Sequence, residues 1–364
     1  MSVYRGAREI FIGSDDLGEL FSGHKKAFIV SDPFMVENHM TNYMTDKLEA
    51  RGIETQVYSE VGSDPSIELV AKGVSVISEA KPDLIIAFGG GSAIDLCKAM
   101  MFFAQKQGLV DDAKFVVVPT TSGTGSEVTD FSVITDTEKE IKYPLVDRAL
   151  MPDAAILDCE LTKSVPPAFT AATGMDAITH AVESYISNMA TPLTEYNAIK
   201  GLQILYENLP KVVADGSDMD AREQMMLGCI ITGFSFSNAN LGFVHAIAHT
   251  LSAHFGLAHG MANACVLPYV MAYNAEACPE KMVELAKAIG LTPSGDLEKD
   301  KFLLSDALLA LCRKLGIKTL KEQNVPEDAF DRLSDDVLKE PVLGFNPRQG
   351  VTKEDVIEIL KKAY

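Results

Sequence analysis

Side chains that could bind a metal ion are concentrated in two short segments of this chain. Five of the seven histidines lie in TGMDAITHAVE and GFVHAIAHTLSAHFGLAHGMANA. Asp176 and His180 are four residues apart, as are His245 and His249, so each pair would share one face of a helix. A carboxylate and several imidazoles on apolar segments are ligands that suit iron(II) or zinc.

The alternative is that these histidines are core residues held by hydrogen bonds. Two such pairs are hard to explain by packing, because buried ionisable groups are costly unless they are paired or coordinate a metal. We therefore predict a divalent metal site. The spacing alone leaves open which four of six side chains bind the metal: Asp176, His180, His245, His249, His254 and His259.

Composition restricts the class of protein. A length of 364 residues predicts two domains, and 47% hydrophobic with 23% charged residues is typical of a globular protein. The formal net charge of −19 argues against nucleic acid and anionic membranes as partners. The chain has no run of about eighteen apolar residues and no secretory pattern at its start. Six scattered cysteines without a C-x-x-C pair favour free thiols in a reducing cytoplasm.

The first half of the chain alternates between short β-rich runs and amphipathic helical stretches. Near-continuous apolar strands that alternate with helices predict a parallel sheet covered on both faces. We expect the strands at residues 26–32, 55–61, 82–89, 114–120 and 154–158. We expect the helices between them at residues 36–51, 66–80 and 92–107.

Strand signals stop after residue 165, where Pro166 and Pro167 open a succession of helical periodicities. We expect helices at residues 171–188, 193–215, 219–240, 244–254, 278–289 and 303–315. The predicted fold class is α/β plus all-α. A parallel-sheet domain at 1–165 would precede a helical, metal-binding domain at 166–364.

Two glycine-rich stretches follow predicted strands. In the first, three glycines precede Ser92 and a helix, so the backbone could approach a phosphate and the helix start offers free N–H groups. The second, PTTSGTGSEVT, is rich in hydroxyls that would suit the phosphates and ribose of a nucleotide. Neither stretch completes a dinucleotide fingerprint or a Walker P-loop. The alternative for the first stretch is a tight turn between a strand and a helix.

Asp32 lies just after the first predicted strand. An acid at this place can accept hydrogen bonds from the ribose hydroxyls of adenosine and repel a 2′-phosphate, which favours NAD over NADP. It could instead be the N-cap of a helix that starts at Pro33. The sequence leaves both roles open.

Six motifs of the chain carry a family resemblance: GGGSAIDLCKAM, PTTSGTGSEVT, KYPLVD, TGMDAITHAVESY, HAIAHTLSAHFGLAHGMANA and FNPR. Together they resemble the iron-containing (group III) alcohol dehydrogenases, over essentially the whole chain. The length and the opening strand pattern are most similar to the short 1-propanol dehydrogenase type. The resemblance implies an NAD-binding α/β domain and a helical domain, with the metal and the nicotinamide in the cleft between them.

The resemblance also implies a set of metal ligands. They are Asp176, His180, His245 and His259, with iron(II) as the usual metal and zinc as a possible one. His249 matches a position close to the substrate and nicotinamide that does not usually bind the metal. His254 has no implied role, and we expect it to be structural.

Further positions match the cofactor and substrate sites of the family. The implied NAD contacts are Asp32, Asp64, Gly90, Gly91, Ser92, Thr120, Thr121, Ser132 and Lys142. Phe236 matches a residue that lines the substrate pocket. Two positions depart from the family pattern: Asn240 stands where relatives commonly have Gly, and Ala258 stands where Pro is common.

The implied activity is the reversible oxidation of a short primary alcohol, such as 1-propanol, to its aldehyde. The metal would act as a Lewis acid on the substrate oxygen, and hydride would pass to the nicotinamide. His249 would carry the released proton toward solvent. Because relatives often assemble, we expect a homodimer or a larger homo-oligomer.

Three alternatives share these features. They are a glycerol or diol dehydrogenase of the same superfamily, a sugar-phosphate lyase similar to dehydroquinate synthase, and a non-catalytic relative that binds metal and nucleotide. The lyases need basic residues to bind a charged substrate. Residues 234–264 contain no Lys or Arg, which favours a small, uncharged alcohol or aldehyde.

Overall fold

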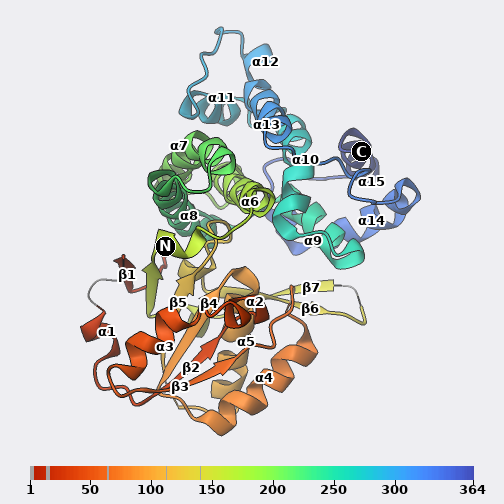
Figure 1. Cartoon of the computed structure of the whole chain (residues 1–364). Helices are drawn as coiled ribbons and strands as arrows, with labels where there is room; N and C mark the ends of the chain where they lie inside the picture. Colours follow the sequence, from red (N-terminus) through yellow and green to blue (C-terminus); the bar gives the residue numbers. More distant parts are fainter. Residues whose placement is uncertain (1–3, 14–16, 64, 112, 140) are drawn as a thin grey trace. The chain divides into compact units, whose positions relative to one another are not determined.

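The computed structural model describes residues 4–13, 17–63, 65–111, 113–139 and 141–364 (Figure 1). They form two compact units. A helical unit contains residues 4, 122–124 and 163–364, and an α/β unit contains residues 5–121 and 125–162. The predicted domain boundary between residues 165 and 166 stays a prediction.

The α/β unit contains a six-stranded sheet in which all neighbouring strands are parallel, as predicted. The strand order is β1-β8-β5-β4-β2-β3. Their bounds are β1 (Glu9–Ile12), β2 (Lys26–Val30), β3 (Glu54–Tyr58), β4 (Leu84–Gly89), β5 (Lys114–Pro119) and β8 (Ala154–Leu157). A separate antiparallel hairpin consists of β6 (Phe131–Asp136) and β7 (Ile141–Val146).

Helices cover both faces of this sheet. Their bounds are α1 (Gly18–Phe21), α2 (Pro33–Glu37), α3 (Asn42–Glu49), α4 (Ile67–Ala80) and α5 (Gly91–Lys106). In β4, Ile85 and Ala87 belong to a core shared with α4 and α5, whereas Ile86 and Phe88 belong to one shared with α1 and α3. Because side chains alternate along a strand, burial on both faces produces the continuous apolar runs seen in the sequence.

One predicted helix of this unit is wrong, and the short helix α1 and three strands were not predicted. The helix expected at residues 36–51 is divided into α2 and α3. The division has a local cause: Asp32 accepts a hydrogen bond from the Met35 N–H (3.0 Å) and caps α2, and His39 takes a left-handed φ of 58° that ends this helical path. The strands that the sequence did not predict are β1, β6 and β7.

The helical unit is built around one hydrophobic core. Its main helices are α6 (Pro167–Ile186), α7 (Pro192–Ala214), α8 (Met219–Ala239), α9 (Phe243–Phe255), α10 (His259–Asn274), α11 (Pro279–Ala288), α12 (Leu297–Asp300), α13 (Leu303–Lys314), α14 (Phe330–Val337) and α15 (Lys353–Lys362). The helices α12, α14 and α15 were not predicted, and neither was α10. It is buried around most of its circumference and therefore lacks the apolar stripe that marks an amphipathic helix.

In the part of the chain that the structure describes, no single helix is long and apolar enough to cross a membrane. Only α8 and α9 taken together would reach that length and composition, and they are bent by 100°.

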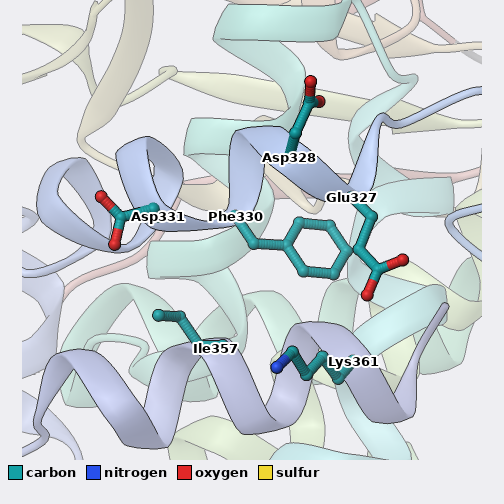
Figure 2. A pocket seen from close by; sticks show the side chains of 6 residues that line it. All are labelled: Glu327, Asp328, Phe330, Asp331, Ile357 and Lys361. Atoms are coloured by element: carbon teal, nitrogen blue, oxygen red, sulfur yellow. The ribbon is translucent and has the colours of Figure 1, made fainter.

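An open hollow of about 550 Å³ lies beside α14 and α15 (Figure 2). It is lined by Glu327, Asp328, Phe330, Asp331, Ile357 and Lys361. None of the metal or cofactor candidates named above lines it.

Candidate metal centre and nucleotide site

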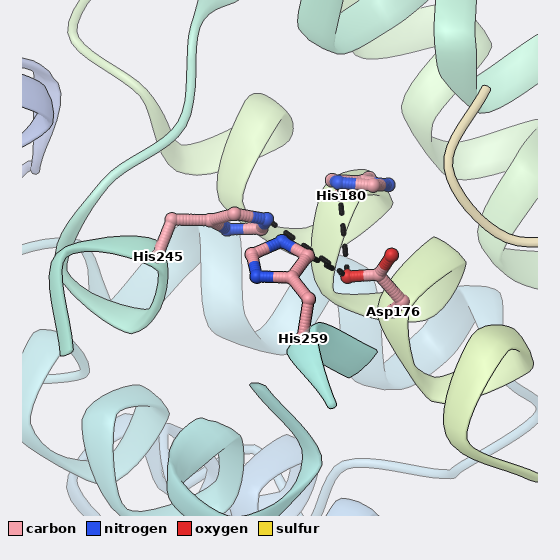
Figure 3. A group of neighbouring side chains, drawn as sticks. All are labelled: Asp176, His180, His245 and His259. Carbon is pink, nitrogen blue, oxygen red and sulfur yellow. Dashed lines mark ion pairs between the residues drawn. The ribbon is translucent and has the colours of Figure 1, made fainter. Parts of the chain in front are cut away.

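Four side chains of the helical unit converge on one point (Figure 3). They are Asp176 and His180 on α6, His245 on α9, and His259 at the start of α10, and their ligand atoms all lie within 4.8 Å of one another. Oδ1 of Asp176 lies 3.8, 4.0 and 3.7 Å from the Nε2 atoms of the three histidines in that order. Ligands about 2.1 Å from a shared tetrahedral ion would lie about 3.4 Å apart, so a small contraction completes the site.

The fold brings these side chains together through three helices. One turn of α6 separates Asp176 from His180. α9 ends at Gly256, whose φ of 64° is a left-handed conformation that favours glycine, and α10 begins three residues later at His259. The chain therefore turns back toward His245 after the end of α9.

Gly260 permits the start of α10 to pack directly on α6. A Cβ atom at this position would lie 2.4 Å from the carbonyl oxygen of Ala172 and 3.2 Å from the Cβ of Asp176. Only a residue without a side chain allows the two backbones to approach so closely. The close approach places His259 next to Asp176 and His180, the candidate ligands on α6.

The electrostatics of the cluster prepare it for a cation. Asp176, His180 and His245 are 2, 4 and 1% exposed. Burial, and then the neighbouring imidazole of His245, hold the pKa of His180 well below its usual value. Burial and His249 act in the same way on the pKa of His245. Neutral imidazoles and one carboxylate are the forms that bind a metal, so this donor set fits iron(II) or zinc.

Two polar neighbours of the cluster were not found from the sequence. Nδ2 of Asn263 donates a hydrogen bond to Oδ1 of Asp176 at 2.6 Å, and lies 3.3 and 3.2 Å from the Nε2 atoms of His245 and His259. Oε2 of Glu183 lies 2.6 Å from Nδ1 of His245. Helical spacing could have indicated both, because Asn263 follows His259 by four residues and Glu183 follows His180 by three.

Glu183 is a carboxyl group inside the helical core. Its Oε1 accepts a hydrogen bond from the backbone N–H of Val244 at 2.7 Å. Burial raises the pKa of Glu183 to about 7, whereas the backbone N–H groups of residues 244, 242 and 245 lower it. The contact links α6 to the first turn of α9.

The remaining candidates of the helical unit lie beside the cluster or apart from it. His249 is outside the group of four, but its ring stacks on that of His259 at 5.4 Å and its Nδ1 lies 3.1 Å from Oε2 of Glu340. Nε2 of His254 lies 3.1 Å from Oδ2 of Asp336. The ring of Phe236 stacks on His180 with centroids 4.2 Å apart.

In the α/β unit, candidate nucleotide-binding residues meet at the carboxyl ends of β2, β4 and β5. A Cβ at Gly89 would lie 3.4 Å from Oδ2 of Asp32, and a Cβ at Gly90 would lie 3.4 Å from Cγ2 of Thr121. Gly90 is the N-cap of α5 and provides no side chain for its free N–H groups. Such a helix start, with Gly91 as its first residue, is suited to bind a phosphate.

The other candidates of this unit have the following places. Oγ1 of Thr120 is buried without a hydrogen-bond partner among the described residues, so it is available to a ligand. The Ser92 hydroxyl donates to the carbonyl of Ser63, and Ser132 on β6 donates to the carbonyl of Asp95 at 2.8 Å. The predicted contacts also include Lys142, which is buried on β7, and Asp64, which lies outside the described residues.

A buried cation, which the sequence did not reveal, fixes the loop that follows β5. Lys98 on α5 is fully buried, and its Nζ donates to the carbonyls of Ser126, Thr129 and Phe131 at 2.7, 2.8 and 3.0 Å. Asp95, one turn earlier, accepts from the Ser126 hydroxyl at 2.7 Å. The helix with the candidate phosphate site thus also holds the segment that leads into β6.

Comparison with known proteins gives this chain a family. The sequence model of the iron-containing alcohol dehydrogenases matches residues 7–159, and that of the C-terminal part of the Fe-containing alcohol dehydrogenase family matches residues 170–364. The NADPH-dependent butanol dehydrogenase of Clostridium saccharobutylicum is 37% identical over an alignment of 382 positions, gaps included, that covers 98% of this chain and 96% of that protein.

A second relative and a solved structure agree with this assignment. The 1-propanol dehydrogenase PduQ of Citrobacter freundii is 41% identical over 314 residues, 86% of this chain and 82% of that protein. The crystal structure of a 1,3-propanediol oxidoreductase is similar over 100% of both chains, with a TM-score of 0.94 and 33% identity. The chain therefore belongs to the iron-containing alcohol dehydrogenase family, and it is an oxidoreductase that acts as an alcohol dehydrogenase.

Proposed function

We propose that this enzyme interconverts a short primary alcohol, such as 1-propanol, and its aldehyde with NAD(H). We further propose that Asp176, His180, His245 and His259 hold its metal, iron(II) or zinc. The observation that carries the proposal is the convergence of these four ligand atoms within 4.8 Å of one another. Similarity to a 1-propanol and a butanol dehydrogenase supports a short, straight-chain substrate.

Each bound group has a distinct chemical task. When bound, the metal supplies Lewis acidity to the substrate oxygen, and the nicotinamide is the hydride acceptor. Asp176 contributes one negative charge and the three neutral imidazoles contribute none. The ligand set therefore leaves part of the charge of a divalent cation uncompensated, which suits an oxygen that loses its proton.

We propose that His249 takes that proton. Its ring stacks on His259, and its Nδ1 lies 3.1 Å from Oε2 of Glu340. The Glu340 side chain is 13% exposed, so it connects the imidazole to solvent. We propose that a proton taken by His249 passes from Nδ1 to this carboxylate.

The surroundings of the cluster favour an uncharged substrate. Phe236 stacks on His180, and residues 234–264 contain no Lys or Arg that could bind a phosphate or carboxylate. A diol is the second candidate substrate, because the chain is similar to a 1,3-propanediol oxidoreductase over its whole length.

The preference for NAD is proposed from Asp32. Its Oδ1 caps α2, whereas its Oδ2 would lie 3.4 Å from a Cβ at Gly89, beside the candidate phosphate site. A carboxylate at this place accepts hydrogen bonds from ribose hydroxyls and repels a 2′-phosphate. The butanol dehydrogenase relative is named as NADPH-dependent, so the preference needs a direct test.

The proposal is tested with protein purified without oxygen and loaded with iron(II). We expect oxidation of NADH with propanal or butanal, and slower oxidation of NADPH. Faster oxidation of 1,3-propanediol than of 1-propanol with NAD would favour the diol alternative. If metal and NADH bind but no short aldehyde is reduced, the proposed activity is wrong and a non-catalytic role is favoured.

The Asp32→Ser variant separates the two roles of Asp32. Serine still caps α2, so the melting temperature should change little. The loss of the carboxylate should raise kcat/KM with NADPH relative to NADH by roughly tenfold or more, since ~1.4 kcal/mol corresponds to a factor of ten. An unchanged ratio would contradict a role for Asp32 in cofactor choice.

We also propose that the enzyme forms a homodimer or a larger homo-oligomer and works in the cytoplasm. All six cysteines are free thiols in the structure, which supports a reducing compartment. Light scattering coupled to size exclusion would give the oligomeric state, and a monomeric mass would contradict the first part of this proposal.

A further inference from the structure

We propose that Glu183 is a positioning residue of the metal centre. It fixes the tautomer and the direction of the His245 ring, so that Nε2 of this ring presents a lone pair to the metal. The inference rests on the proposed ligand set, in which His245 binds the metal.

The geometry of the pair is that of a shielded, direct contact. Oε2 of Glu183 lies 2.6 Å from Nδ1 of His245, and each side chain is 1% exposed. On α6, Glu183 follows Asp176 by seven residues and His180 by three, so all three share one face of the helix. One helix therefore supplies two proposed ligands and the support of a third, which lies on α9.

The chemistry of the two groups determines the tautomer. A divalent cation bound by His245 would favour the ionised form of Glu183. An ionised carboxylate can only accept hydrogen bonds, and a neutral imidazole carries one N–H. The contact with Glu183 places that hydrogen on Nδ1 and leaves the lone pair on Nε2. Nε2 is the atom that faces the cluster, 4.0 Å from Oδ1 of Asp176. Carboxylates that hold a metal-binding histidine in this way raise the basicity of the ligand and keep its ring in place.

Glu183 also has a structural role, which uses its other oxygen. Oε1 accepts the backbone N–H of Val244 at 2.7 Å. Val244 is the second residue of α9, and the N-cap of this helix, Gly242, provides no side-chain hydrogen bond. Glu183 thus satisfies a free N–H of α9 and places a negative charge near its N-terminus. The two roles use separate atoms and can be separated by substitution.

The Glu183→Gln variant separates them. The glutamine carbonyl oxygen can still accept from Val244, which keeps the helix cap, while its NH₂ group faces Nδ1 of His245. The glutamine NH₂ donates a hydrogen bond only if Nδ1 carries a lone pair, so the imidazole hydrogen moves to Nε2. Nε2 then has no lone pair to offer the metal. We expect the dissociation constant for Zn²⁺, measured by competition with a chromophoric chelator, to rise by about 10- to 100-fold. The melting temperature of the metal-free protein should change by only a few degrees.

A matched control is Glu340→Gln, which makes the same change beside Nδ1 of His249. Because His249 lies outside the group of four, the Zn²⁺ dissociation constant should stay within about twofold of the wild-type value. The His245→Ala variant tests the ligand set itself and should lose most of the affinity. The positioning role of Glu183 is overturned, with the ligand set intact, if His245→Ala loses the metal but Glu183→Gln binds it as Glu340→Gln does. If His245→Ala binds Zn²⁺ normally, the ligand set is wrong, and the inference is wrong with it.

A measurement on the unmodified enzyme keeps the inference testable if Glu183→Gln does not fold. Nitrogen-15 NMR of histidine-labelled, Zn²⁺-loaded protein reports which ring nitrogen carries the hydrogen. The inference requires the Nδ1–H form for His245, identified by its loss in His245→Ala. The Nε2–H form would overturn the inference.

Discussion

Substitution of Gly260 by alanine tests the packing that brings together α6 and α10, two helices of the candidate metal centre. A Cβ at this position would lie 2.4 Å from the carbonyl oxygen and 2.9 Å from the carbonyl carbon of Ala172. An ordinary van der Waals contact begins at 3.4 Å, so the two groups must separate by about 1 Å. Both atoms of Ala172 belong to the backbone of α6, and no side-chain rotation can relieve the contact.

The displacement acts directly on the cluster. His259 precedes residue 260, and Asp176 follows Ala172 by one helical turn, so separation of α6 and α10 lengthens the 3.7 Å distance between His259 Nε2 and Asp176 Oδ1. Overpacking of a tight contact costs about 1–3 kcal/mol, and a 1 Å misplacement of a functional group can cost about 10²-fold. We expect Gly260→Ala to bind Zn²⁺ at least about tenfold more weakly and to melt several degrees lower.

The measurements are chelator competition, thermal unfolding and the anaerobic assay with propanal and NADH. The control is Gly344→Ala, because an added Cβ at this exposed position meets no atom within 4 Å. If Gly260→Ala matches Gly344→Ala in metal affinity and melting temperature, the close packing of α10 on α6 is not what holds the site together.

Three further substitutions test other parts of the molecule. Asn240, the C-cap of α8, has φ 63° and ψ 178°, a conformation that is essentially restricted to glycine. Asn240→Gly should therefore raise the free energy of unfolding, measured by urea titration, by about 1 kcal/mol. A lower free energy of unfolding would contradict the strain at Asn240. Lys98→Met leaves three buried carbonyls and Asp95 without their cation. We expect the free energy of unfolding, measured by the same method, to fall by about 3–5 kcal/mol. A fall of less than ~1 kcal/mol would show that this cation does not hold the loop. Burial raises the pKa of Glu127 from 4.5 to about 7, so the folded protein holds this proton more tightly than the unfolded chain and loses stability as the pH rises through that window. The wild-type protein should therefore lose roughly 1–3 kcal/mol of unfolding free energy relative to Glu127→Gln between pH 4 and pH 8, since a pKa unit is worth about 1.4 kcal/mol. Parallel profiles of unfolding free energy against pH for the two proteins would refute this.

Local periodicity predicted much of the fold, and the errors have identifiable causes. The five predicted strands are present. Four of them, β2, β4, β5 and β8, are buried at nearly all positions and are therefore almost continuously apolar, whereas β3 is a partly exposed edge strand. The edge strand β1 was missed because it is short and exposed at most of its positions. The helix α10 was missed for the opposite reason, because burial on most sides removes the periodic contrast between apolar and polar residues.

For the candidate metal centre, residue spacing predicted which side chains share one helix face. It did not predict which side chains of different helices meet, because that depends on the path of the chain between helices. The i, i+4 spacing predicted a pair of His245 with His249 as readily as a pair of Asp176 with His180. The structure groups His245 with His259 instead, because α9 ends at Gly256 and α10 returns along it. Only the family resemblance predicted this grouping. The spacing of Glu183, three residues after His180, places it on the same face of α6, but its contact with His245 on α9 becomes visible only when the helices are assembled.

A metal bound by the cluster would link protein lifetime to metal supply, because the cluster is built from three helices. An ion held by α6, α9 and α10 would act as a cross-link between chain segments that are far apart in sequence. A ligand at one hundred times its dissociation constant adds about 2.7 kcal/mol to the free energy of unfolding. Cells short of metal would then hold a less stable pool of this protein, which proteases would remove faster, so the amount of enzyme would follow the availability of its metal.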